Sequence, residues 1–228
     1  AYLIQEELKL LYLNLKENFS IGKKVGCTSV DAQKQLDISE PFYGNLFSRF
    51  YAISPKIILS KKFSKPFIEP EIALRVKEDI DISRAPYSIS DIEDLFDGFV
   101  CSLEIVDFRF NKTLKEIGAL NLIATNGASE FWIRDSKIYD LEIINFENHE
   151  INISFNDKIV GKGNTSSVMG NPFNSALWLI NKLANNGETL LKNQFISTGT
   201  CTKAHELKAN TKITADFGIL GKIEFFYN

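Results

Sequence analysis

Short strand-like segments separated by turn residues follow one another along most of this chain, and they constrain its fold more than any other feature. Such runs of apolar and β-branched residues predict strands after Pro55, with few helices between them. The expected strands cover residues 21–26, 56–59, 67–76, 98–108, 122–125, 129–134, 141–146, 150–156, 158–163, 194–198, 212–217 and 221–226. Asn156 and Asp157 suit the turn of a hairpin between two of them. We therefore expect one β-rich domain over residues 1–228, without repeats or linkers.

Helical patterns are confined to a few places. The N-terminal segment has an apolar stripe with helical spacing, formed by Leu3, Ile4, Leu8, Leu11 and Leu15. Residues 29–36 and 90–96 predict two short polar helices. Residues 172–185 predict the clearest helix, because Asn171 can cap it, Pro172 suits its first turn and Gly187 suits its exit.

Charge and composition exclude several classes of protein. The chain has 26 basic and 29 acidic residues, a net charge of −3, and so lacks the basic excess of a nucleic-acid binder. It has no apolar run long enough to span a membrane and no visible signal peptide. Its three cysteines (Cys27, Cys101 and Cys201) are widely spaced without a CxxC pair, and Cys101 lies in an apolar run that indicates the core. We expect a cytoplasmic protein with free thiols, bound to neither nucleic acid nor membrane.

Two glutamates in the segment FIEPEIAL are the first candidates for chemistry. Glu69 and Glu71 are two residues apart, so on a strand their side chains lie on the same face. Pro70 between them has no N–H, which favours an edge or an irregular stretch over a central ladder. Adjacent carboxylates repel each other, and a hard divalent cation such as Mg²⁺ would relieve this repulsion. The alternative is a pair of strand glutamates that face water.

The segment CSLEIVDFR places two further carboxylates, Glu104 and Asp107, in an apolar strand. A carboxylate with apolar neighbours on both sides is expected to be buried, and a buried charge needs a partner. That partner is either a metal or a cation within the sheet, for which Arg75 and Arg109 are available.

Two lysines lie between glycines in IGKKVGCTS. On a strand, Lys23 and Lys24 project to opposite faces, so only one of them can face a site. An exposed basic pair is the alternative to a functional lysine.

These segments resemble, in order and over nearly the whole chain, the 2-keto-4-pentenoate hydratase / 4-oxalocrotonate decarboxylase family, which is similar to the C-terminal domain of fumarylacetoacetate hydrolase. The motifs that carry the resemblance are GKKVGCTS, EPFYGNLF, FIEPEIAL, SLEIVDFR, TNGASEFW, MGNPFNSALWLINKLANNGETL and FISTGT. The resemblance implies an α+β fold with a mixed, rolled β-sheet and flanking helices, and a homo-oligomer. The opening AYLIQ matches an element that follows an N-terminal helical segment in family members, so we expect that segment to be truncated here.

The same resemblance implies a site. Glu69, Glu71 and Glu104 match the ligands of Mg²⁺ or Mn²⁺, and Lys24 matches the active-site lysine, while Lys23 stands where an aromatic residue is common. Asp107 and Arg109 match a pair beside the third ligand, with a supporting role. Three further residues match segments near the site, and contacts to substrate are expected from Asn126, Ser129 and Ser166.

The implied activity is that of a metal-dependent lyase on a small 2-oxo acid, in which the metal stabilises an enolate and Lys24, with its pKa lowered by burial and the metal, supplies charge or a proton. Hydration of a 2-hydroxy-dienoate and decarboxylation of a 4-oxalocrotonate-type acid both remain open. Phe42 stands where hydratases carry an acid, which favours decarboxylation unless Asp37 or Glu40 substitutes. Thr125 and Ala128 also depart from the family pattern. A hydrolase of C–C bonds would need a base such as His149 or His205, which lie outside every motif, and an inactive scaffold is the remaining alternative.

Overall fold

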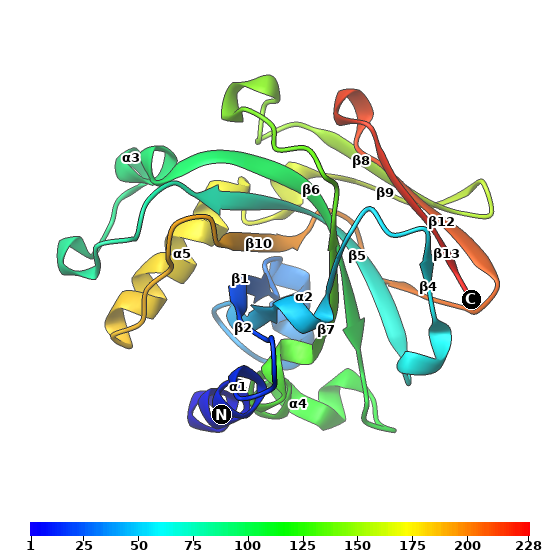
Figure 1. Ribbon diagram of the computed structural model, residues 1–228, viewed down its shortest axis with the longest axis horizontal. Coiled ribbons are helices and arrows are strands. Elements are labelled where there is room, and N and C mark those ends of the chain that lie inside the picture. Colours follow the sequence, from blue (N-terminus) through cyan, green and yellow to red (C-terminus); the bar gives the residue numbers. More distant parts are fainter.

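Two β-sheets form the framework of this chain, for which a computed structural model describes residues 1–228. The strands of the first sheet are β1 (Ser20–Gly26), β2 (Phe42–Phe47), β3 (Tyr51–Ile53), β5 (Pro66–Val76), β6 (Phe96–Asp107), β7 (Ser129–Arg134), β10 (Phe195–Thr200) and β11 (His205–Glu206). They are ordered β2–β1–β10–β5–β6–β7–β3, with β11 paired to β5. The second sheet has the order β4–β13–β12–β8–β9 and is formed by β4 (Ile57–Ile58), β8 (Glu150–Phe155), β9 (Lys158–Asn164), β12 (Thr211–Asp216) and β13 (Lys222–Tyr227). Figure 1 shows it on the right of the molecule.

Five α-helices flank the sheets: α1 (Tyr2–Leu13), α2 (Val30–Leu36), α3 (Ile89–Ile92), α4 (Leu114–Ala124) and α5 (Pro172–Asn185). The expected cap of α5 is confirmed, because Asn171 accepts a hydrogen bond from its first turn, and Ser29 caps α2 in the same way. In Figure 1, α1 and α4 lie together at the bottom and α5 lies on the left. No helix is both long enough and apolar enough to cross a membrane.

The first sheet is curled, and its two faces have different environments. On β5, Ile68, Ile72 and Leu74 face the main hydrophobic core, which also receives side chains from the second sheet and α5. Side chains from five strands meet on the opposite, concave face, where β2 approaches β7: Leu46, Ala73, Val100, Trp132 and Phe195. Glu69 and Glu71 lie on this concave face because they alternate with Ile68 and Ile72 along the strand.

Two expected strands are wrong. Residues 122–125 form the end of α4. This helix begins with a capping box between Thr113 and Glu116, which was not predicted. Residues 141–146 contain only a 3₁₀ turn (Leu141–Ile143), and the strand expected at residues 56–59 is reduced to Ile57–Ile58. The hairpin turn at Asn156–Asp157 is confirmed, since both residues have positive φ.

Pro70 lies in a central strand, so of the two expected settings, an edge or an irregular stretch, the second is present. The ladder is irregular at this point, as the missing N–H requires. On one side of β5, the partner changes from β10, which pairs up to Glu71, to β11, which pairs with Ile68 and Phe67. The interruption leaves Glu69 and Glu71 on a strand that is fully paired to β6 on its other side.

The apolar stripe of α1 points to solvent. Leu3 is 85% exposed and Leu11 66%, whereas Gln5 is the one buried residue of this helix. α1 is therefore attached to the body of the protein through the hydrogen bonds of Gln5 and through the rings of Tyr2 and Tyr12, which pack against Tyr43 and against Phe47 and Phe50.

Candidate metal centre

Three carboxylates converge on the concave face of the first sheet. Glu69 of β5 lies directly opposite Glu104 of β6 in the antiparallel ladder, and Glu71 is two residues further along β5. One oxygen atom of each side chain lies within 4.8 Å of the others. The expectation that Glu69 and Glu71 share a face is thus confirmed, and Glu104 joins them.

Glu104 is fully buried and lacks a hydrogen-bond partner for either carboxylate oxygen. Its nearest cation is Lys24 of β1, whose Nζ lies 3.2 Å from Oε2. The alternative pairing with an arginine is wrong, since Arg75 binds Asp97 and Arg109 binds Glu130. Lys24 pairs with Oε2 only, so Oε1 remains buried without a partner, which is costly and which a metal cation at this position would relieve.

Glu71 is held by donors from β10. Ser197 donates a hydrogen bond of 2.5 Å to Glu71 Oε2, and the N–H of Gly199 donates a longer one of 3.3 Å to the same oxygen. Ser197 in turn accepts a hydrogen bond from the indole of Trp132. Ser197 was not among the predicted site residues, although it lies in the motif FISTGT.

The pKa values follow from this crowding. Burial and the nearby Glu104 raise the pKa of Glu69 to about 7, against the opposing effect of Lys24. Burial, together with Glu104 and Glu69, raises the pKa of Glu71 well above its ordinary value. With all three carboxylates ionised, they and the lysine carry −3 + 1 = −2, which a divalent cation would balance. The oxygen-only donor set suits a hard cation such as Mg²⁺.

Lys24 faces the carboxylates and Lys23 the opposite side of β1, as alternation along a strand requires. Burial alone would lower the pKa of Lys24, but Glu104, Glu69 and Glu71 outweigh it and raise the pKa above its ordinary value. The expected lowering included the effect of a bound metal and stays a prediction; without metal, the three carboxylates dominate the electrostatics of this lysine.

Apolar and small residues surround the end of Lys24. Its Nζ lies 5.7 Å from the centre of the Phe42 ring, and a Cβ at Gly127 would come within 3.0 Å of its Cε. Phe42 and Ala128 belong to a small apolar cluster with side chains of α4. Lys24 is thus enclosed by protein on the side away from the carboxylates.

The other expected site residues differ in their surroundings. Asp107 is buried and accepts hydrogen bonds from the backbone N–H groups of Ser64 and Lys65, so it fixes the turn that leads into β5. A cavity of about 170 Å³ lies beside it, lined by Asp107, Arg109, Phe110, Leu122, Thr125 and Ala128.

The three residues expected to contact substrate have different surroundings. The Asn126 amide is bound to Asn45. Ser129 is half-buried at the start of β7, and Ser166 is exposed on a 3₁₀ turn.

Comparison with solved structures identifies the fold class. A yeast fumarylacetoacetate hydrolase family protein is 15% identical and superposes with a TM-score of 0.64, covering 100% of this chain and 96% of its own. 4-Oxalocrotonate decarboxylase from Pseudomonas putida G7, complexed with magnesium and adipate, is 25% identical with a TM-score of 0.93, covering 100% of this chain and 84% of its own. The curled mixed sheet is therefore the fold of the fumarylacetoacetate hydrolase family, as expected.

Sequence comparison narrows this class. No family model matches the chain. 2-Keto-4-pentenoate hydratase 1 of Dechloromonas aromatica is 26% identical over 207 residues, which are 91% of this chain and 77% of the relative. 4-Oxalocrotonate decarboxylase of Pseudomonas putida is 27% identical over 231 residues, covering 98% of this chain and 83% of the relative. The chain is a homologue of 2-keto-4-pentenoate hydratases and 4-oxalocrotonate decarboxylases, which confirms the resemblance seen in its motifs.

Proposed function

We propose that this chain is a divalent-metal-dependent lyase of the 2-keto-4-pentenoate hydratase type, acting on a small 2-oxo or 2-hydroxy-dienoic acid. The observation that carries this proposal is the fully buried Glu104, which pairs with Lys24 and has a carboxylate oxygen within 4.8 Å of Glu69 and Glu71. The names of its homologues support the same class of reaction.

In this proposal Glu69, Glu71 and Glu104 hold Mg²⁺ or Mn²⁺. When bound, the metal would act as a Lewis acid that stabilises negative charge on the 2-oxygen of the substrate. Ser197 keeps Glu71 oriented toward its neighbours through the 2.5 Å hydrogen bond. Solved structures of similar proteins are described as complexes with magnesium, calcium or manganese, which supports a divalent cation at this site.

Lys24 is the candidate catalytic residue. Its ammonium group lies 3.2 Å from Glu104 Oε2, so it can place a positive charge beside the developing negative charge or donate a proton to the dienoate carbon chain. The closed surroundings formed by Phe42 and Gly127 exclude water from its far side. Low local polarity strengthens the electrostatic effect of this ammonium group.

Decarboxylation of a 4-oxalocrotonate-type acid is the second candidate, and Phe42 favours it. The aromatic ring beside Lys24 offers neither an acid nor a base to a water molecule, whereas loss of CO₂ needs no added water. Asp37 and Glu40 are the acids nearest in sequence, but the Glu40 carboxylate is bound to Lys182 and Trp178 of α5. An inactive scaffold would retain the fold without metal-dependent turnover.

Product analysis tests the choice. The protein is incubated with Mg²⁺ and either 2-hydroxypenta-2,4-dienoate or 4-oxalocrotonate, and products are separated by chromatography. A hydroxy-oxo acid from the dienoate supports hydration, and CO₂ release from 4-oxalocrotonate supports decarboxylation. No Mg²⁺-dependent product from either acid would contradict the proposed lyase.

Phe42→Asp is expected to raise the ratio of hydration to decarboxylation by roughly tenfold or more, because the new carboxylate can serve as a general acid or base. The measurement is the ratio of kcat/KM for the two substrates. Phe226→Asp, which changes an exposed phenylalanine on β13, is the control and should leave the ratio unchanged. An unchanged ratio in Phe42→Asp would reject the role of this position in choosing the reaction.

We further infer that residues 1–228 form a single domain that acts in the cytoplasm as a homo-oligomer. The three free cysteines support a reducing compartment. The exposed apolar residues of α1, Leu3 and Leu11 among them, are a surface that a neighbouring subunit would cover.

A further inference from the structure

A strained loop presses against Lys24. Asn126, Gly127 and Ala128 have φ values of +64°, +64° and +57°, in the left-handed region that residues with a side chain seldom adopt. The close approach of Gly127 to Lys24 Cε depends on this conformation. A backbone in this conformation persists only where surrounding contacts enforce it.

The Asn126 side chain supplies the first of these contacts. Its Oδ1 accepts a hydrogen bond of 2.7 Å from the N–H of Asn45, and its Nδ2 donates one of 3.0 Å to the carbonyl of the same residue. The amide thereby binds β2 as a neighbouring strand would. Gly44 permits this approach, because a Cβ there would lie 2.5 Å from the Asn126 carbonyl oxygen.

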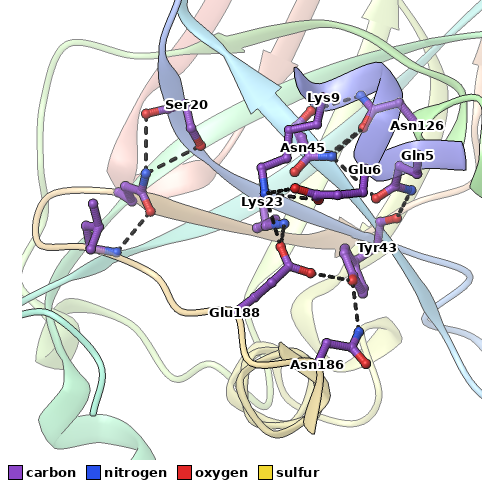
Figure 2. A network of polar contacts seen from close by, with 12 residues as sticks. Gln5, Glu6, Lys9, Ser20, Lys23, Tyr43, Asn45, Asn126, Asn186 and Glu188 are labelled. Carbon is purple, nitrogen blue, oxygen red and sulfur yellow. Dashed lines mark hydrogen bonds and ion pairs between the residues drawn. The ribbon is translucent and has the colours of Figure 1, made fainter. Parts of the chain in front are cut away.

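Gln5 of α1 supplies the second set of contacts. It is 2% exposed, and its Nε2 donates to the carbonyls of Tyr43 (2.9 Å) and Ile123 (2.7 Å). Its Oε1 accepts a longer hydrogen bond of 3.3 Å from the Asn45 side chain. Gln5 therefore joins β2 to the end of α4, the two elements between which the strained loop is held, and Figure 2 shows these side chains together.

A separate branch of the same network fixes α1 without reaching the loop. Lys9 donates to Glu188, which also binds Lys23 at 2.8 Å and the Tyr43 hydroxyl at 2.9 Å (Figure 2). This branch lies on the face of β1 opposite to Lys24. A change in this branch therefore weakens the attachment of α1 without altering the contacts that support the loop 126–128.

We propose that Gln5, Asn45 and Asn126 are positioning residues that hold the loop 126–128 against Lys24, so that α1 contributes to the catalytic site from outside it. This inference rests on the proposed function of Lys24. We call these three residues the relay. The hydrogen bonds of Gln5 in the relay explain why the one buried residue of α1 is polar. The relay acts on the position of the lysine side chain and leaves the three carboxylates untouched.

Gln5→Met tests the relay, because methionine is similar in size and cannot make the three hydrogen bonds. We expect kcat to fall roughly 10- to 100-fold, the loss typical of a slightly misplaced catalytic group. The affinity for oxalate in Mg²⁺ should remain within about threefold of wild type, since the carboxylates are unchanged. Hydrogen exchange of the amides of residues 124–128 should become faster.

Two further variants separate positioning from general loss of structure. Lys9→Met removes the contact of α1 with Glu188 but keeps Gln5, and it should leave kcat and the exchange of residues 124–128 unchanged. Asn126→Gly removes the amide but tolerates positive φ, and it should lower kcat as Gln5→Met does. The double variant Gln5→Met/Asn126→Gly should show no further loss of kcat, because both residues act through the same loop.

The relay is overturned if Gln5→Met keeps wild-type kcat, or if Lys9→Met lowers kcat equally. If the wild-type protein turns over neither substrate, the proposed function fails, and hydrogen exchange alone decides the relay. In that case unchanged protection of residues 124–128 in Gln5→Met rejects it, and faster exchange supports it.

Discussion

Glu71→Gln is expected to abolish Mg²⁺-dependent turnover while leaving the metal-free protein at least as stable as wild type. The amide keeps the size of the side chain and can still accept the hydrogen bond from Ser197. It removes one of three negative charges from a buried cluster in which burial and Glu104 already raise the pKa of Glu71. Without metal, a negative charge on Glu71 destabilises the fold, whereas metal binding requires this charge.

The comparison is made by thermal unfolding in EDTA and in Mg²⁺, together with steady-state turnover. Mg²⁺ should raise the melting temperature of wild type and have little effect on Glu71→Gln, whose metal affinity we expect to fall roughly 100-fold or more. Glu78→Gln is the matched control, because Glu78 is exposed and paired only with Lys192. Wild-type turnover in Glu71→Gln would reject the metal assignment.

Lys24→Met is expected to lower kcat by roughly 10²- to 10⁴-fold, the usual contribution of a positioned acid–base group. It also leaves Glu104 buried without a cation, so the metal-free variant should lose roughly 3–5 kcal/mol of stability, which Mg²⁺ should restore in part. Lys24 thus affects both chemistry and the balance of charge.

Lys23→Met provides a closely matched control, since Lys23 is the preceding residue on the same strand and faces Glu188. It should destabilise the protein but retain wild-type kcat. The measurements are steady-state kinetics at saturating Mg²⁺ and denaturant unfolding with and without metal. Equal kcat for Lys24→Met and wild type would reject the catalytic role of Lys24.

The carboxylate cluster could be predicted because it depends on local patterns. The two-residue spacing of Glu69 and Glu71 fixes a common face on any strand, and the apolar neighbours of Glu104 announce its burial. Their convergence also needs the register of β5 against β6, which no single segment encodes and which only the family resemblance implied. Ser197 could not be predicted from its own segment, because its hydrogen bond to Glu71 depends on the pairing of β10 with β5.

Errors in the fold arose where a local pattern was ambiguous. The apolar residues 122–125 resemble a short strand, but they complete a helix whose start is marked by the Thr113–Glu116 capping box. The N-terminal leucine stripe correctly predicts a helix, but Leu3 and Leu11 are exposed and the buried residue of this helix is Gln5. The sequence of a helix does not indicate which backbone carbonyls from distant segments a polar side chain such as Gln5 will bind.

Calorimetric titration of oxalate, a mimic of the enolate, into the wild-type protein tests the central claim most directly. The titration is performed once with saturating Mg²⁺ and once with EDTA. A metal-dependent site formed by Glu69, Glu71 and Glu104 predicts binding with Mg²⁺ and none with EDTA. Absence of binding in both titrations, or equal binding in both, would contradict a metal-dependent 2-oxo-acid site in this protein.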